Sequence, residues 1–168
     1  MKTTTISAVL IMSLLFAGCG KKASSTSSTP SAAVPVAQPA ITAWQQGDKP
    51  VAVNSFVATD WSARPLFAST SPLSLTEDQF KGLPDAERQA KAGEIVSQLD
   101  SLKQLAGAVA QAGREAASKG DKAQARKHFT SVKECGMALD SPDALSLVQL
   151  VGKALKKMAD TELGKVGQ

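Results

Sequence analysis

The sequence is poor in the side chains that enzymes most often use for chemistry. It has no tyrosine, one histidine and two cysteines in 168 residues. Two close carboxylate pairs, Asp85 with Glu87 and Asp140 with Asp143, each lie at an expected helix start, where capping and the helix dipole explain them. No phosphate-binding loop or nucleophile elbow is present either. We therefore expect no enzyme activity and no cofactor.

A metal site is not expected either. His128 and Cys135 lie seven residues apart on one predicted helix, but a zinc site needs a second pair of ligands at suitable spacing. Cys135 is expected to be buried, because a free cysteine usually behaves as a small core hydrophobe. His128 is expected on the flank of its helix.

A strong charge of one sign is also lacking. The chain has 19 Lys and Arg against 15 Asp and Glu, giving a formal net charge of +4. Both signs are interspersed along residues 76–168, so no basic stripe of the kind that binds phosphate backbones is formed. A nucleic-acid partner is not predicted.

Hydrophobic runs are short. The longest apolar stretch, residues 6–16, follows the basic start Met1-Lys2 and has eleven residues. A membrane-spanning helix needs about 20 apolar residues. This length is instead typical of the apolar region of a cleaved export signal.

Residues 15–19, LFAGC, resemble the lipobox of bacterial lipoproteins. Phe16 replaces the usual leucine at position minus three, with Leu15 one place before it. The resemblance implies that residues 1–18 are removed and that Cys19 becomes an N-terminus carrying acyl chains such as palmitate. Two or more acyl chains hold a protein stably on a bilayer.

The same resemblance bears on location. Gly20, rather than aspartate, follows the cysteine, which by the sorting rule of these lipoproteins favours the outer membrane, facing the periplasm. The alternative is an ordinary signal peptide that ends near a cysteine. Bulky Phe16 or Leu15 would then occupy the position where signal peptidase prefers a small residue.

Residues 19–40 are rich in Ser, Thr, Pro and Ala and have no large apolar side chains to build a core. This composition predicts a flexible tether between the lipidated cysteine and the folded part.

The pattern GDK-x-x-A-x-x-x-F occurs twice, at residues 47–56 and 120–129. Glycine allows the left-handed conformation that ends one helix, and aspartate caps the next. Alanine and phenylalanine four residues apart share a face of that second helix. The pattern therefore predicts two helical hairpins.

These hairpins resemble the turn and second helix of a tetratricopeptide repeat, which implies a protein-binding surface. The resemblance covers residues 41–60 and 106–139. It departs from the family where Met137 replaces the closing proline and where the copies lie 73 residues apart instead of about 34. Ordinary turn and cap chemistry shared by two unrelated hairpins is the alternative.

The periodicity predicts an all-α fold of antiparallel hairpins, with a small helical pair and an extended connector in 41–75 and a hairpin domain in 76–168. The small pair covers 41–46 and 49–60. Thr76 opens a short helix with a capping box, and a long helix follows over 85–118. Its apolar seam steps alternately by four and three residues, as does that of the partner helix after Gly120.

A last helix is expected to begin at Pro142, with Ser141 as its cap, and to end at Gly164. Its apolar stripe is expected to follow Leu145, Val148, Val151, Leu155 and Met158 and to be widened by Leu147 and Leu150.

Four aromatic residues are candidates for partner binding or for the core: Trp44, Phe56, Trp61 and Phe129. We interpret Trp44 and Trp61 as core residues, and Phe129 as lining a partner-binding groove. The sequence as a whole predicts a membrane-anchored envelope lipoprotein that presents a helical protein-interaction module. The alternatives are a structural spacer and a small-molecule-binding lipoprotein that uses the two tryptophans.

Overall fold

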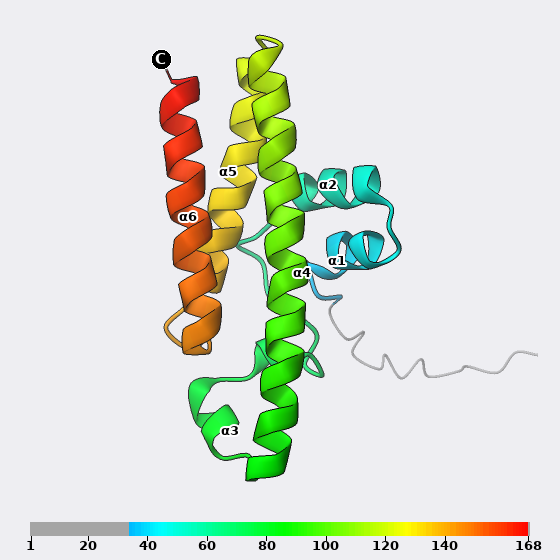
Figure 1. Ribbon diagram of the computed structural model, residues 1–168, viewed down its shortest axis with the longest axis vertical. Coiled ribbons are helices and arrows are strands. Elements are labelled where there is room, and N and C mark those ends of the chain that lie inside the picture. Colours follow the sequence, from blue (N-terminus) through cyan, green and yellow to red (C-terminus); the bar gives the residue numbers. More distant parts are fainter. Residues whose placement is uncertain (1–33, 168) are drawn as a thin grey trace, which may run out of the picture. The chain divides into compact units, whose positions relative to one another are not determined.

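The computed structural model describes residues 34–167, which contain six α-helices and one 3₁₀ turn (Figure 1). In chain order the elements are α1 (Gln38–Gln45), α2 (Lys49–Ala58), η1 (Pro72–Ser74), α3 (Glu77–Lys81), α4 (Asp85–Ser118), α5 (Lys122–Leu139) and α6 (Ser146–Val166). The only extended pairing in this range is an isolated antiparallel bridge between Thr76 and Ala144. The all-α prediction is confirmed. The predicted signal peptide, Cys19 and most of the tether lie outside the described residues.

Three long helices form the body of the fold (Figure 1). Helix α4 has 34 residues, and α5 returns antiparallel to it after the turn at Gly120. Helix α6 packs mainly on α5 and runs parallel to α4, to which the Arg114–Glu162 ion pair joins it at 3.2 Å. The small pair α1–α2 packs against α4 and α5.

The predicted seams are the buried faces of α4 and α5. On α4 the buried set includes Ile95, Leu99, Leu102, Ala106, Val109 and Gly113, and on α5 it includes Ala125, Phe129, Val132, Gly136 and Leu139. Helix α4 is continuous over Gly93 and Gly107. The four-three stepping therefore identified the contact between these helices.

The two GDK segments form the same turn. Gly47 and Gly120 have φ of +80° and +82°, and Asp48 and Asp121 cap their helices by accepting the backbone N–H three residues on. The backbone N–H of each aspartate donates to a carbonyl five residues earlier, at 3.0 Å for Asp48 and 2.9 Å for Asp121. The helical hairpins predicted from the pattern are both present.

One core spans the predicted small pair and the hairpin domain. Trp61, just beyond α2, stacks on Phe56 with ring centroids 4.6 Å apart. Its indole N–H donates to the carbonyl of Phe56 and to Ser131 Oγ on α5. Buried side chains from both ranges belong to the same hydrophobic cluster, which ties α1–α2 to the long helices.

Helix α6 begins four residues later than predicted and ends later too. It starts at Ser146, and Gly167 rather than Gly164 is its C-terminal cap residue. The carboxylate of Glu77 accepts hydrogen bonds from the N–H and hydroxyl of Ser146, replacing the local cap expected from Ser141. The hydrogen bonds to Glu77, 69 residues earlier in the chain, thus determine the start of α6 in place of the local Ser141-Pro142 signal.

Two further predictions are wrong: the end of the tether and the width of the apolar stripe on the last helix. Helix α1 begins at Gln38, inside the range assigned to the tether, and Ala37 and Ala40 are fully buried. On α6 the buried stripe contains Val148, Gly152, Leu155 and Ala159, whereas Leu147 and Leu150 are exposed. These two leucines lie on a different side of the helix from the residues that contact α5.

Helices α5 and α6 approach closely at Gly136 and Gly152. A β-carbon placed on Gly152 would lie 2.7 Å from the carbonyl oxygen of Gly136 and 2.8 Å from the backbone nitrogen of Asp140. Because these are backbone atoms, the helices would have to separate to admit even a methyl group.

We predict that Gly152→Ala lowers the free energy of unfolding by about 1–3 kcal/mol, because it overpacks this crossing. Gly93→Ala is the matched control: no atom lies within 4 Å of a β-carbon there, so the gain in helix propensity should raise stability by about 0.5–1 kcal/mol. Urea unfolding followed by circular dichroism measures both. Equal stability of the two variants would contradict the close approach.

Candidate functional site

The four predicted aromatic residues do not form a surface site. Phe56 is 0%, Phe129 1% and Trp61 2% exposed, so all three are core residues. Trp44 is half-buried on α1, with the ammonium of Lys49 5.9 Å from its ring centre. The core interpretation of Trp61 is confirmed, and the tryptophans do not provide an open aromatic patch.

The role of Phe129 in a partner-binding groove stays a prediction. Phe129 is 1% exposed and belongs to the lining of an opening of about 330 Å³ between α4, α5 and α6. Its ring lies against Gly113 of α4, where a β-carbon would be 2.8 Å from the ring. Glycine at that position lets the ring fill the space between α4 and α5. The Ala–Phe spacing of the repeat therefore serves the packing of the hairpin.

His128 and Cys135 are both buried and do not form a metal site. The ring Nδ1 of His128 lies 2.8 Å from the carbonyl oxygen of Gln124 in its own helix. Burial raises the pKa of the Cys135 thiol, which therefore stays protonated and unreactive. No group of three potential metal ligands occurs among residues 34–167.

An open groove of about 450 Å³ with a mostly apolar lining lies between the connector after α2 and the loop that joins α5 to α6. Its apolar lining includes Leu66, Leu73, Leu75, Leu139, Ala144 and Val148. We call this feature the apolar groove. Its volume falls in the usual range for ligand sites.

Two charged residues of opposite sign stand at the edge of the apolar groove. Arg64 is held by its own turn, because its guanidinium donates to the carbonyls of Trp61, Ser62 and Ala63 at 3.0–3.3 Å. Asp143 is exposed in the α5–α6 loop. A ligand in the groove thus meets an apolar floor with a cation and an anion at its rim.

Two carboxylates fix the segments around the apolar groove. Glu77 accepts from Ser146 and thereby joins α3 to α6, and Asp140 forms a 2.7 Å ion pair with Lys156. The hydrogen bond from the Ser146 backbone lowers the pKa of Glu77, and the hydrogen bond from Lys156 lowers the pKa of Asp140. Both groups therefore hold the loop in their ionised form.

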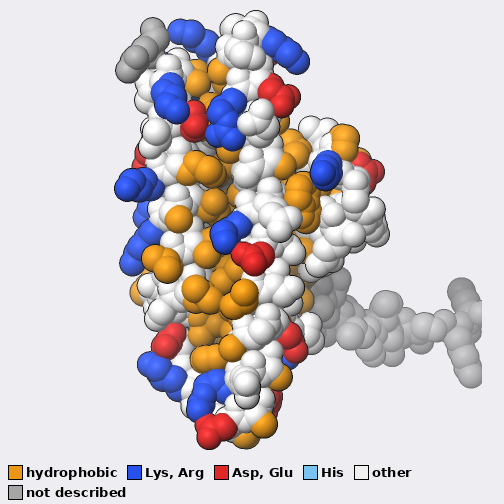
Figure 2. Space-filling model, in the orientation of Figure 1, with side chains coloured by type: hydrophobic (Ala, Val, Ile, Leu, Met, Phe, Trp, Pro, Cys, Tyr) orange, Lys and Arg blue, Asp and Glu red, His pale blue; other side chains and the backbone are white. Residues whose placement is uncertain are grey.

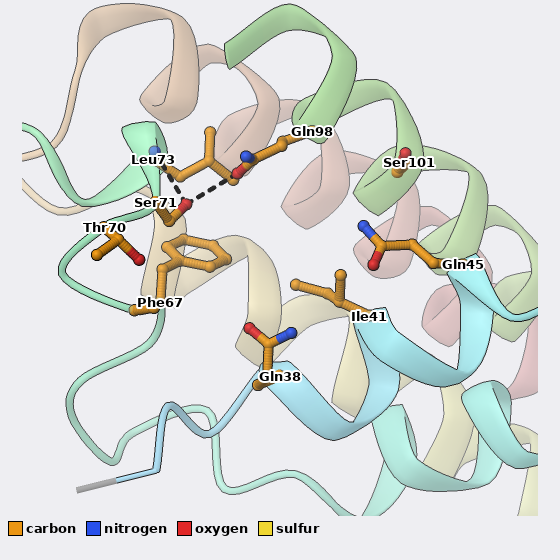
Figure 3. A pocket seen from close by; sticks show the side chains of 10 residues that line it. Gln38, Ile41, Gln45, Phe67, Thr70, Ser71, Leu73, Gln98 and Ser101 are labelled. Carbon is orange, nitrogen blue, oxygen red and sulfur yellow. Dashed lines mark hydrogen bonds between the residues drawn. The ribbon is translucent and has the colours of Figure 1, made fainter. Parts of the chain in front are cut away.

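A second, smaller pocket of about 240 Å³ lies between α1, α4 and the connector (Figure 3). The side chains of Gln38, Gln45 and Gln98 surround it, and Phe67 and Ile41 supply apolar surface. Ser71 donates to Gln98 Oε1 at 2.8 Å, so part of its polar lining is already paired. Its lining carries no charged side chain.

Sequence reasoning missed the apolar groove. Its lining comes from the connector and the α5–α6 loop, which have no periodicity to interpret. The signal available was the spacing of Leu66, Leu73 and Leu75 in a stretch expected to be extended, since apolar side chains in a connector need a surface to cover.

Comparison with known proteins adds no assignment to this geometry. No protein family, no curated sequence and no solved structure shows a significant match to the chain. Within the described part of the chain, no helix combines the length and the apolar character that crossing a membrane requires.

We predict that acid loosens the loop around the apolar groove. The folded-state pKa values of Glu77 and Asp140 lie below their ordinary values, so their stabilisation is complete above those ordinary values and is lost as the pH falls through the lowered ones, below about pH 4. Urea unfolding at a series of pH values should show stability falling in this window.

The double variant Glu77→Gln/Asp140→Asn should be less stable at neutral pH and should show a shallower loss in acid. Glu134→Gln is the control, because Glu134 is exposed on α5 and forms no ion pair with any residue that the structure describes. Identical acid profiles for the double variant and the unmodified chain would refute this role of the two carboxylates.

We also predict that Cys135 does not react with Ellman's reagent in the folded chain, because its side chain is fully buried and its thiol protonated. The assay uses the Cys19→Ser variant, so that Cys135 is the only thiol. Reaction should become complete in denaturant. Rapid modification of the native protein would show that α5 opens readily.

Proposed function

We propose that the chain is a lipoprotein of the bacterial cell envelope, held on a membrane by acylated Cys19, whose helical body binds a segment of another protein. The LFAGC segment supports the anchor, and Gly20 supports the periplasmic face of the outer membrane. The apolar groove is the observation that carries the binding role, because its lining is mostly apolar and its walls are fixed by specific interactions.

The chemistry of the apolar groove suits a polypeptide segment. Its floor of leucine and valine side chains accepts apolar side chains, while Arg64 and Asp143 at the rim offer partners for one acidic and one basic group. At the Thr76–Ala144 bridge, Leu75 and Thr76 have extended backbone beside the groove. Peptide segments commonly bind along extended backbone with pockets for alternate side chains.

The repeated turns support a role in protein binding independently. Two hairpins built on the same Gly-Asp turn resemble the units of tetratricopeptide-type modules, which present helical surfaces to partners. Fold alone does not determine function, so the proposal depends on the groove and not on this resemblance.

The anchor is tested by metabolic labelling with a palmitate analogue in a bacterial host. The unmodified chain should incorporate the label, remain in the membrane fraction and lose residues 1–18. Cys19→Ser should remove the label and release the protein, because the thiol is the acylation site. Label that persists in Cys19→Ser would place the acyl group elsewhere.

Binding is tested by a photoreactive amino acid at Leu75 in the apolar groove, with the control position Val51 on α2, which is 49% exposed. We expect the Leu75 probe, irradiated in native membranes, to capture one partner near one-to-one stoichiometry. Ala144→Glu should abolish this capture, because a charge would replace apolar surface in the groove, whereas Val51→Glu should not.

One result would contradict binding at the apolar groove. The same diffuse set of proteins captured from Leu75 and Val51, unaffected by Ala144→Glu, would remove the binding role. The chain would then be better explained as an anchored spacer whose long helices supply length without a dedicated ligand.

A further inference from the structure

One side of α6 combines exposed leucines with exposed lysines. Leu147 is 42% and Leu150 63% exposed, and both are among the six exposed large apolar residues of the described range. Figure 2 shows apolar side chains continuing along the surface between α6 and α4. Exposed apolar side chains that gather on one part of a small body mark a candidate contact surface.

Lysines follow these leucines at helical spacing. Lys153 is three residues and Lys157 seven residues after Leu150, so all three project from one side of α6. From Ser146 to Met158 the helix has no acidic residue. We call Leu147, Leu150, Lys153 and Lys157 the α6 outer face.

Of the lysines on α6, Lys153 and Lys157 are the least engaged in ion pairs. Lys156 is bound to Asp140 at 2.7 Å, whereas Lys153 approaches Asp140 only to 4.0 Å and its side chain is 62% exposed. Lys157 is exposed and forms no ion pair with any residue of the described range. A surface that binds the α6 outer face must therefore accept leucine side chains and carry negative charge.

We propose that the α6 outer face lies on the anionic surface of a lipid bilayer. Interfacial helices bind in this way, with leucines entering the boundary between headgroups and acyl chains and lysines contacting anionic headgroups. A second copy of the chain is the other occupant, and a concentration-dependent dimer would identify it.

The proposed anchor allows this contact and strengthens it. Fourteen residues lie between Cys19 and Val34, and the chain between these two positions spans at most about 50 Å, which is about the length of the 34-residue α4. Any face of the body can thus reach the bilayer that holds Cys19. Because the anchor keeps the body close, even a weak contact of the α6 outer face would be largely occupied. This contact adds to the proposed lipoprotein function. It rests on that function only because acylated Cys19 brings the body to a membrane.

The test uses the unacylated chain, residues 19–168 with Cys19→Ser, so that binding does not depend on the lipid anchor. Residues 32–168 form a compact unit that contains the whole described core, so removal of residues 1–18 leaves it intact. Sedimentation with vesicles of phosphatidylcholine alone, or mixed with phosphatidylglycerol, measures the fraction bound.

We expect binding to the mixed vesicles and little to phosphatidylcholine alone, with a decrease as ionic strength rises. Leu147→Ser/Leu150→Ser should reduce partitioning at least about tenfold, because leucine insertion is lost. Lys153→Gln/Lys157→Gln should reduce it only for vesicles that contain phosphatidylglycerol. Both pairs are exposed, so folding should be unaffected, as circular dichroism would verify.

Two controls match these changes on other surfaces. Met137→Ser removes an apolar side chain that is 57% exposed on α5, and Lys119→Gln/Lys122→Gln removes the same charge near the α4–α5 turn. Both should bind like the unmodified chain.

Absence of binding to mixed vesicles, or equal losses in the control and α6 variants, would overturn the proposal. So would a concentration-dependent dimer that Leu147→Ser/Leu150→Ser disrupts without changing vesicle binding. None of these results depends on acylation of Cys19 or on the apolar groove, so this proposal and the proposed function fail separately.

Discussion

Helix α5 packs so closely against α4 and α6 that the fold depends on glycine at the points of closest approach. Gly113 of α4 accommodates the ring of Phe129, and Gly136 and Gly152 bring the backbones of α5 and α6 together. Dispersion forces act only at short range, so this proximity gives the densely packed interior its stability.

The apolar groove and the α6 outer face both follow from that arrangement. With α5 and α6 locked together, the loop of residues 140–145 must cross the end of the bundle, where Glu77 and Lys156 hold its two sides. The connector after Trp61 lies opposite this loop, and the space between them is the groove. Helix α6 uses one side to contact α5, which leaves Leu147 and Leu150 on a side that the described chain does not cover.

Local signals predicted most of the fold. Three of these signals act within a few residues: the Thr76 capping box, the two Gly-Asp turns and the four-three stepping of α4 and α5. All three are present in the structure. Prediction failed where distant contacts decide. Ser141-Pro142 is a good local helix start, but Glu77 begins α6 at Ser146. Leu150 has the hydrophobicity of a core residue, and only the direction of α5 shows that it is exposed. The groove is formed by two segments without periodicity, and the leucines of the connector were the one signal of it.

The hydrogen bond from Trp61 to Ser131 bears on the order in which the chain assembles. Each Gly-Asp hairpin closes a loop of a few residues, whereas this contact joins positions 70 residues apart. The entropic cost of closing a loop rises with the separation along the chain. This cost is therefore small for the two hairpins and larger for the docking of α1–α2 onto α5. The indole of Trp61 is buried only after that docking. Its fluorescence would therefore report the last step of folding, while the helical signal reports the earlier ones.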